Sequence, residues 1–357
     1  MKDMMNVVKS RLGASIQGCL LSGLALAAVA GCAGDDQPTV VLYVSADEYV
    51  AREVAAAFEV QTGIRIDLVG DTEARKTTGL VERLRAEHAA GNPQADVFWS
   101  SEVFMTIDLA AEGVLEPYES AATADWPEAF RDSEGRWYGF AARARVIAYA
   151  PERVSEEDIP QTWMDLTKDY YRGRVVMADP RFGTTGGHLG AMKAYWDRQF
   201  MPGIYTAFLE GLAANEVRVL TSNAGVVRAI AGGEADFGMT DTDDVWAARE
   251  QGANMELVYP RHSPEDGEGT GTLLIPNTVS RVAGGPNADT AAQLIDFLLS
   301  AETERLIART VSRNVPIRAE MGEDFAEYAI PDPLQVDLKR AAANRVVAVE
   351  EAMRLLQ

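Results

Sequence analysis

Cysteine and histidine are scarce in this sequence, and several catalytic motifs are missing. The 357 residues include two cysteines, both within the first 32 positions, so the rest of the chain folds without a disulfide. The three histidines, His88, His188 and His262, have no His-x-x-x-His spacing, which is typical of zinc sites on a helix. No Gly-x-Ser-x-Gly segment supplies a nucleophile elbow. These absences argue against an enzyme. A secreted hydrolase is the most remote alternative, because paired carboxylates remain for acid–base chemistry.

Positive charge is also sparse. The formal net charge is −21, and lysine and arginine are dispersed without a basic tract. This charge argues against a nucleic acid or an anionic membrane surface as partner, because both attract basic patches. The chain is longer than a typical domain with a single hydrophobic core, so we expect two domains.

The N-terminus has the pattern of an export signal. A basic leader precedes an apolar run at 19–30, which is too short to span a bilayer as a stable helix. The run ends in Val-Ala-Gly-Cys, and this segment resembles a bacterial lipoprotein box. The resemblance implies cleavage before Cys32 and lipid on its sulfur; the alternative is an ordinary signal peptide with a chance cysteine. We therefore expect a lipoprotein signal peptide at 1–31 and a polar tether at 32–39.

Three strand–helix units follow the tether, and each strand ends in polar residues. Apolar and alternating runs predict strands at 40–44, 64–69 and 95–99, with amphipathic helices between them. Such units form a parallel sheet with right-handed crossovers, so the carboxyl ends of the strands share one edge. Small molecules bind at that edge in open α/β sheets. The polar residues there are Ser45 and Asp47, then Asp71, Thr72 and Glu73, then Ser100, Ser101 and Glu102.

Two long apolar runs, at 136–149 and 271–282, are candidates for crossings between two domains. The strand–helix pattern restarts between them, and the tail of the chain is helical. We therefore expect a discontinuous lobe 1 at 40–144 and 271–357, and a lobe 2 at 145–270.

The first crossing contains two arginines, and lobe 2 contains a turn whose groups suit an anion. Arg143 and Arg145 point the same way on a strand, where they can bind an anionic group or pair with surface acids. A glycine-rich turn at 179–188 carries two hydroxyls, Thr184 and Thr185, in front of a helix. Free N–H groups and the helix dipole favour negative charge there. The turn is no Walker loop, because the Gly-Lys-Ser/Thr ending is missing.

An acidic stretch follows the predicted strand at 235–239. Residues 240–244 crowd three carboxylates and two threonine hydroxyls into five positions, although one aspartate would cap the next helix. The stretch is either an over-capped helix start or a loop that faces a ligand at the carboxyl end of a strand.

Several segments, taken in order, resemble a known family. They are residues 95–100, 143–147, Asn223 before an apolar helix, 233–238 and 271–278. The order is similar to that of bacterial periplasmic solute-binding proteins, close to the ferric-iron-binding members. The resemblance implies an α/β fold of type II, with two lobes of mixed or parallel sheets, flanked by helices and joined by two β-crossings.

The same resemblance implies a function. The chain would be a monomeric substrate-binding lipoprotein, not an enzyme, that captures a small solute between its lobes. It would deliver the solute to an ABC permease with its ATPase. Lipid on Cys32 would anchor it to a membrane on the periplasmic side of the cell envelope.

The ligand groups depart from the ferric-binding pattern. In that pattern, two adjacent tyrosines follow the strand that is equivalent to residues 235–239 of this chain. Asp243 and Asp244 stand at those positions, Asp47 stands at a histidine position, and Ser101 or Glu102 stands at an acid position. The resemblance therefore implies a site of carboxylate and hydroxyl oxygens. Its candidate ligand-binding residues are Ser45, Asp47, Ser100, Ser101, Glu102, Arg143, Arg145, Gly183, Thr184, Thr185, Asn223, Asp241, Asp243 and Asp244.

Two solutes suit this set. In the first hypothesis, Asp47, Glu102, Asp243 and Asp244 bind a hard cation, because oxygen ligands suit Fe³⁺, Ca²⁺ or Mn²⁺ better than zinc. The arginines, the glycine turn and Asn223 then hold a synergistic carbonate or phosphate, and ferric iron is slightly favoured. In the second hypothesis no metal binds. The anion pocket holds a phosphonate, phosphate or carboxylate, and an aspartate pairs with an amine of the same molecule, as in an aminophosphonate.

Overall fold

A mixed β-sheet flanked by helices organises the residues that the computed structural model describes, namely 37–71, 76–199, 202–263 and 267–356. The predicted signal peptide, the lipid box at Cys32 and the polar residues Thr72 and Glu73 lie outside these ranges. Within them, no helix has both the length and the apolar character that crossing a membrane requires.

The strand order joins two groups of parallel strands. Along the sheet the order is β2-β1-β3-β10-β5-β8-β6-β7, with β4 paired to β10 and β9 paired to β5. β1 runs parallel to β2 and β3, and β6 runs parallel to β7 and β8, as repeated strand–helix units predict. β10 and β5 run antiparallel to the strands beside them and connect the two groups. The strands are β1 (Thr39–Val44), β2 (Arg65–Val69), β3 (Val97–Ser100), β4 (Leu115–Glu116), β5 (Tyr138–Tyr149), β6 (Val175–Ala178), β7 (Arg218–Leu220), β8 (Phe237–Asp241), β9 (Glu256–Val258) and β10 (Leu274–Val282).

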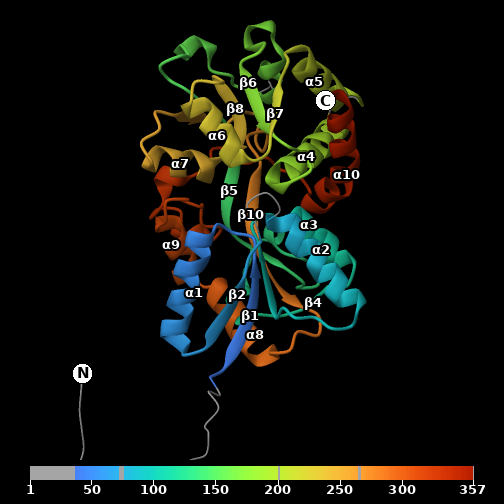
Figure 1. Cartoon of the computed structure of the whole chain (residues 1–357), viewed down its shortest axis with the longest axis vertical. Helices are drawn as coiled ribbons and strands as arrows, with labels where there is room; N and C mark the ends of the chain where they lie inside the picture. Colours follow the sequence, from blue (N-terminus) through green and yellow to red (C-terminus); the bar gives the residue numbers. More distant parts are fainter. Residues whose placement is uncertain (1–36, 72–75, 200–201, 264–266, 357) are drawn as a thin grey trace, which may run out of the picture. The chain divides into compact units, whose positions relative to one another are not determined.

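β5 belongs to both groups. Residues 138–144 pair with β10, and residues 145–149 pair with β8 and β9. Figure 1 shows β5 and β10 in the middle of the fold, between β1 and β2 on one side and β6 to β8 on the other. The change of partner at Arg145 places Arg143 and Arg145 where the two groups meet. The main-chain N–H of Arg145 donates to the carbonyl of Leu273 at 3.0 Å, so the chain entering β10 lies against β5 there.

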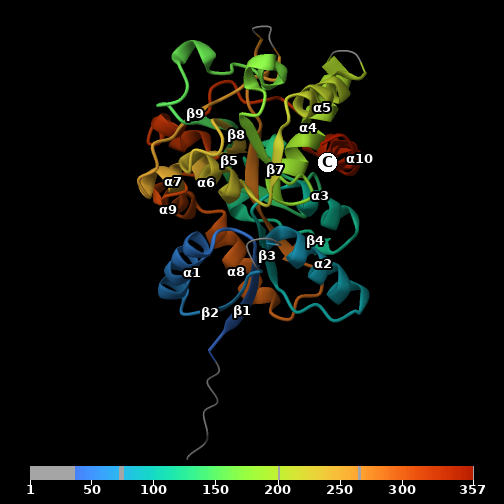
Figure 2. The ribbon, with the colours of Figure 1, turned by 45° about the horizontal axis from the view of Figure 1, so that its top comes forward.

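Alternating strand residues divide the core between the two faces of the sheet. On β1, Val40, Leu42 and Val44 pack in one apolar cluster, and Tyr43 packs in another. Helices cover both faces. Figure 2 shows α6 and α7 on one side of β8 and α4, α5 and α10 on the other. The helices are α1 (Glu48–Thr62), α2 (Lys76–Ala89), α3 (Phe104–Ala111), α4 (Gly183–Gln199), α5 (Ile204–Ala214), α6 (Asn223–Ala231), α7 (Thr242–Glu250), α8 (Ala288–Leu298), α9 (Ala301–Arg309) and α10 (Leu338–Leu355).

A close helix pair fixes the position of α4. The C-terminal helix α10 packs along α4, and it also contacts α3 and α5. A Cβ atom at Gly190 of α4 would lie 2.5 Å from the carbonyl oxygen of Ala341 in α10, so this approach requires glycine. The tail of the chain thus contacts α4, which lies within the expected lobe 2, and α3, which lies within the expected lobe 1. The domain boundaries at 144/145 and 270/271 stay a prediction.

The acidic stretch is not a loop. β8 continues through Asp241, and α7 begins at Thr242, so Asp243 and Asp244 lie in the first turn of a helix. The strand extends this far because Thr240 and Asp241 pair with Val146 and Arg145 on β5. The sequence interpretation ended the strand at Met239, since polar residues at a strand end normally mark a turn.

Candidate functional site

A pocket lies where the two groups of strands meet. Its lining residues come from the carboxyl ends of β1, β3, β6, β7 and β8, from β5, and from the first turns of α2, α4, α6 and α7. Its volume is about 110 Å³, which suits an ion or a small polar solute. The polar lining residues are Ser45, Asp47, Thr77, Thr78, Ser101, Arg143, Asp179, Thr184, Thr185, Thr221, Ser222, Asn223, Asp241, Asp243 and Asp244.

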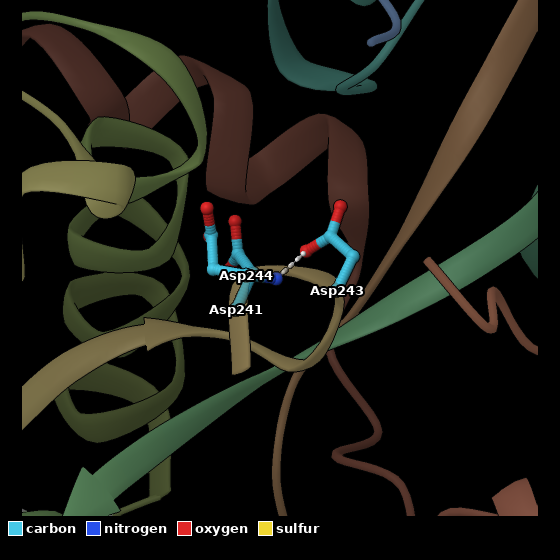
Figure 3. Close-up of side chains that lie close together, drawn as sticks. All are labelled: Asp241, Asp243 and Asp244. Atoms are coloured by element: carbon cyan, nitrogen blue, oxygen red, sulfur yellow. Dashed lines mark hydrogen bonds between the residues drawn. The ribbon is translucent and has the colours of Figure 1, made fainter. Parts of the chain in front are cut away.

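The first side of the pocket, here called the charged wall, consists of Arg143, Asp241, Asp243 and Asp244. One carboxylate oxygen from each aspartate lies within 4.8 Å of the others. Asp241 and Asp243 are buried and Asp244 is partly buried. Figure 3 shows their carboxylates projecting to the same side of the junction between β8 and α7. The junction therefore concentrates negative charge in one place.

Asp243 and Asp244 are adjacent to each other and share one cationic neighbour, Arg143. Arg143 Nη1 lies 3.0 Å from Asp243 Oδ2. Asp243 Oδ1 accepts the main-chain N–H of Asp244 at 3.1 Å, the contact that Figure 3 draws. Asp244 Oδ2 accepts the hydroxyl of Thr240 at 3.2 Å. The close placement of like charges is consistent with a positive charge binding between them.

Burial and repulsion raise the pKa of both carboxyl groups. For Asp243, burial raises the pKa to about 6, Arg143 opposes the rise, and Asp241 and Asp47 add to it. For Asp244, burial and then Asp243 raise the pKa well above its usual value. Both shifts mean that the apo-protein holds these charges at a cost, which a bound cation would remove.

Asp241 differs from Asp243 and Asp244 because both of its carboxylate oxygens already accept hydrogen bonds from other side chains of the protein. Oδ1 accepts Nη1 of Arg145 at 2.7 Å. Oδ2 accepts the Thr184 hydroxyl at 2.5 Å and the side-chain amide of Asn223 at 2.8 Å. Arg145 does not line the pocket; it is fully buried behind Asp241. Of the two arginines that alternation places on one face, Arg143 thus reaches the pocket and Arg145 supports it from behind.

Two helix N-termini contribute to the pocket. α4 begins at Gly183, whose φ of +58° requires the left-handed region that glycine tolerates. α6 begins at Asn223, and Ser222 caps it by accepting the main-chain N–H of Gly225 at 3.1 Å. The side chain of Asn223 is therefore not needed to cap the helix. Its amide donates to Thr184 and Asp241 instead.

The opposite side, here called the hydroxyl wall, consists of Ser45, Thr77, Thr78 and Ser101. Ser45 Oγ lies 3.2 Å from Ser101 Oγ and 3.1 Å from Thr77 Oγ1, and it accepts the main-chain N–H of Ser101 at 2.8 Å. The Thr78 hydroxyl is buried and has no hydrogen-bond partner among the described residues. Asp47 lines the pocket beside this wall. Neutral oxygens thus face the charged wall.

Besides Arg145, two predicted site residues lie outside the pocket lining, Ser100 and Glu102. Both oxygens of Glu102 accept main-chain N–H groups at the start of α3, from Phe104 at 2.9 Å and Met105 at 3.0 Å. Glu102 is fully buried, and burial raises its pKa to about 7. Ser100 donates its hydroxyl to the Glu102 carbonyl at 2.6 Å. This geometry does not support Glu102 as a metal ligand, because the helix N-terminus already uses its carboxylate.

The sequence interpretation also missed lining residues. Thr77 and Thr78 lie in the first turn of α2, beyond the polar cluster that was expected to follow β2. Asp179 follows β6, and Thr221 and Ser222 follow β7, again at the carboxyl ends of parallel strands. The rule that locates ligands at this sheet edge would have found all of them if it had been applied to every strand and to the following helical turn.

The sequence is similar to a known protein family and to several known proteins. The model of a family described as bacterial extracellular solute-binding protein matches residues 92–332. The iron uptake protein A1 of Synechocystis sp. is 27% identical over 314 residues, which cover 82% of this chain and 81% of that one. The major ferric iron-binding protein of Neisseria meningitidis is 23% identical over 325 residues, covering 89% and 92%. The crystal structure of iron-bound HitA from Pseudomonas aeruginosa has a TM-score of 0.75 at 24% identity and covers 88% of this chain and 99% of that one.

Proposed function

The chain belongs to the bacterial extracellular solute-binding protein family, and from that premise we propose that it binds a hard metal cation, with ferric iron first, and delivers it to an ABC permease. The predicted family and its two-lobed type II fold are confirmed by the match over 92–332 and by the likeness to solved binding proteins. The family binds solutes and is not a catalytic one. Relatives whose names state iron binding or iron uptake support iron as the solute here.

One observation carries the choice of a cation: the aspartate trio on the charged wall. Three carboxylates converge within 4.8 Å, and two of them have raised pKa values. Arg145 compensates Asp241, and Arg143 compensates Asp243, so Asp244 has no arginine of its own among the described residues. A cation bound by oxygen atoms would balance this charge, and such ligands suit Fe³⁺, Ca²⁺ or Mn²⁺.

We propose Asp47, Asp243 and Asp244 as the protein ligands of the cation. Asp243 and Asp244 come from one group of strands and Asp47 follows β1 of the other, so a bound cation would join the two sides of the pocket. The carbonate or phosphate expected beside the cation would have to use donors that Asp241 does not already occupy. The unpaired Nε–H of Arg143 is such a donor within the described residues.

Metal analysis tests the proposal. The protein is purified from rich medium, and its metal content is measured by elemental analysis while native mass spectrometry records the intact mass. We expect a metal, iron first, that is lost when Asp243→Asn and Asp244→Asn are combined. The matched control is Asp236→Asn, which changes a partly buried aspartate just before β8 that pairs with Arg153 and Arg174 and does not line the pocket. Metal content that is equal in all three proteins would contradict the assignment of the site.

The second candidate solute is an organic molecule with an amine and a phosphonate, phosphate or carboxylate group. The observation that favours it is that both signs of charge occur in one small pocket. In this proposal the Nε–H of Arg143, which has no partner among the described residues, binds the anionic group, and Asp244 pairs with the amine. Native mass spectrometry separates the candidates, because an organic solute adds a mass without metal.

We further propose that the protein is a monomer anchored by lipid on Cys32 at the periplasmic side of the cell envelope. The sequence of the leader supports the lipid anchor, and a relative that is named a periplasmic iron-binding protein supports the location. Cys32→Ser should move the protein from the membrane fraction to the soluble fraction. A variant that stays in the membrane fraction would contradict the lipid anchor.

A further inference from the structure

We propose that Asp241 is a built-in anion: its carboxylate occupies the place prepared for a carbonate or phosphate, so capture of the solute cation does not depend on a free anion at that place. This inference rests on the proposed cation-binding function. It adds that the anion that relatives would recruit from solution is here part of the chain.

Three donors from three separate segments converge on this one carboxylate. Arg145 of β5 donates at 2.7 Å, Thr184 of α4 at 2.5 Å and Asn223 of α6 at 2.8 Å. The resemblance to ferric-binding proteins implies an anion site that includes the same three residues, Arg145 there being an alternative to Arg143. In the structure their donors already point at Asp241, which is 1% exposed.

The helices strengthen this arrangement. Thr184 lies in the first turn of α4 and Asn223 is the first residue of α6, so Asp241 lies at two helix N-termini, where negative charge is favoured. A guanidinium and two helix N-termini are the donor set that proteins use for carboxylates and phosphates. Here a strand residue fills it, because β8 continues to Asp241 and pairs with Arg145 on β5.

A buried histidine holds Arg145 in this orientation. Arg145 Nε donates to Nδ1 of His188 at 3.3 Å, and burial lowers the pKa of His188 well below its usual value. His188 is therefore a neutral acceptor. It lies on α4 and is fully buried, so Arg145 is directed at Asp241 and not at the pocket.

Asp241 also affects the neighbouring ligands. Its negative charge raises the pKa of both Asp243 and Asp244. A fixed carboxylate next to the cation would contribute to its charge balance as a free anion would. The difference is entropic, because a residue of the fold is already in place and no second particle has to be captured.

Anion binding to the metal-free protein is the first test. Asp241→Ala deletes a carboxylate and leaves Arg145, Thr184 and Asn223 facing the vacated space. We expect the metal-free variant to bind formate and inorganic phosphate in isothermal titration calorimetry and to melt at a higher temperature in their presence. The wild type should show neither effect. Asp236→Ala, which also separates an aspartate from arginines, is the matched control and should behave as the wild type does.

The iron arm is the second test. Iron is supplied as ferric nitrilotriacetate in buffer free of phosphate and bicarbonate. We expect the wild-type affinity to change less than about twofold when formate, phosphate or bicarbonate is added, and that of Asp241→Ala to rise about tenfold or more with formate. Asp241→Asn fills the space without the charge, so formate should not restore its affinity. If Asp241→Ala fails to fold, Asp241→Asn can still be measured in its place.

The outcomes separate this inference from the proposed function. A metal-free wild type that binds formate or phosphate as tightly as Asp241→Ala does would overturn the built-in anion. A metal-free Asp241→Ala that binds neither formate nor phosphate would overturn it as well. If no form of the protein binds iron, the proposed cation fails, but the calorimetry on metal-free protein still decides whether Asp241 occupies an anion site.

Discussion

The two walls of the pocket use opposite strategies. The charged wall places three carboxylates and Arg143 at the junction of β8 and α7, supported by a buried arginine and two helix starts. The hydroxyl wall places four neutral oxygens at the ends of β1 and β3 and the start of α2, and three of them bind one another. The charged wall holds repelling carboxylates together before the solute arrives, whereas three of the four hydroxyls on the hydroxyl wall already have hydrogen-bond partners and only that of Thr78 has none among the described residues. We therefore expect the charged wall to provide most of the affinity for the solute. The hydroxyl wall should mainly determine the shape of the site and close it.

The largest expected effect comes from removing charge from the charged wall. Asp243→Asn combined with Asp244→Asn should lower the affinity for the cation by at least about a thousandfold, because two proposed ligands lose their charge. The melting temperature of the metal-free protein should change little, since both carboxylates are held there with raised pKa values. Ser45→Ala combined with Ser101→Ala is the matched change on the hydroxyl wall and should keep most of the affinity. Equal losses from the two double variants, measured by calorimetry, would break the comparison.

The second effect separates the support of the charged wall from its face. Arg145→Met leaves Asp241 buried without its cation and should destabilise the protein by about 3–5 kcal/mol. Arg143→Met should cost less, because Asp243 lines the pocket, and its pKa of about 6 lets it take up a proton. Urea unfolding of both metal-free variants measures the difference. A larger loss for Arg143→Met would mean that Arg143, and not Arg145, supports the wall.

The third effect is a pH dependence of opposite sign in metal-free and metal-bound protein. Burial raises the pKa of Asp243 from 3.8 to about 6 in the folded state. Folded protein therefore binds a proton before unfolded protein does, and the metal-free form should gain stability as the pH falls from above about 6 toward 4. Cation binding needs the charged carboxylate, so the affinity should fall by up to about tenfold per pH unit below 6 for this group. Metal-free stability that also fell over this range would contradict the sign.

The comparison also shows what the sequence can and cannot reveal. Regular patterns located the strands around the site, because apolar periodicity records which residues face a core. They missed α5 (Ile204–Ala214), although Tyr205, Phe208, Leu209 and Leu212 have helical spacing and are buried. The crowding of acids identified the charged wall. The hydroxyl wall stayed partly hidden, since Thr77 and Thr78 look like ordinary residues of a helix start.

Residue roles were harder to predict than positions. Glu102 and Asp241 are acids at or just beyond the end of a buried strand, yet the carboxylate of Glu102 caps α3 and that of Asp241 accepts hydrogen bonds from an arginine, a hydroxyl and an amide. Which donors reach a carboxylate depends on tertiary contacts between segments far apart in the chain. Asp241 lies 96 residues from Arg145 and 57 from Thr184. No local pattern records those contacts.

The smallest effect should come from the hydroxyl wall itself. Thr78→Val keeps the size of the side chain and removes a buried hydroxyl that has no hydrogen-bond partner within the described ranges. If this hydroxyl contacts the solute or a water on it, the affinity should fall by about threefold to tenfold, the cost of one neutral hydrogen bond. The stability of the metal-free protein should stay the same or rise, because an unsatisfied buried group is removed. Thr77→Val, which removes a hydroxyl that bonds to Ser45, should instead lower stability and change affinity less. Calorimetry measures the affinity of the two variants, and urea unfolding measures their stability. Together they show whether the hydroxyl wall contacts the solute through Thr78 or only supports the pocket. An unchanged affinity in Thr78→Val would mean that the charged wall and Asp47 provide all of the binding.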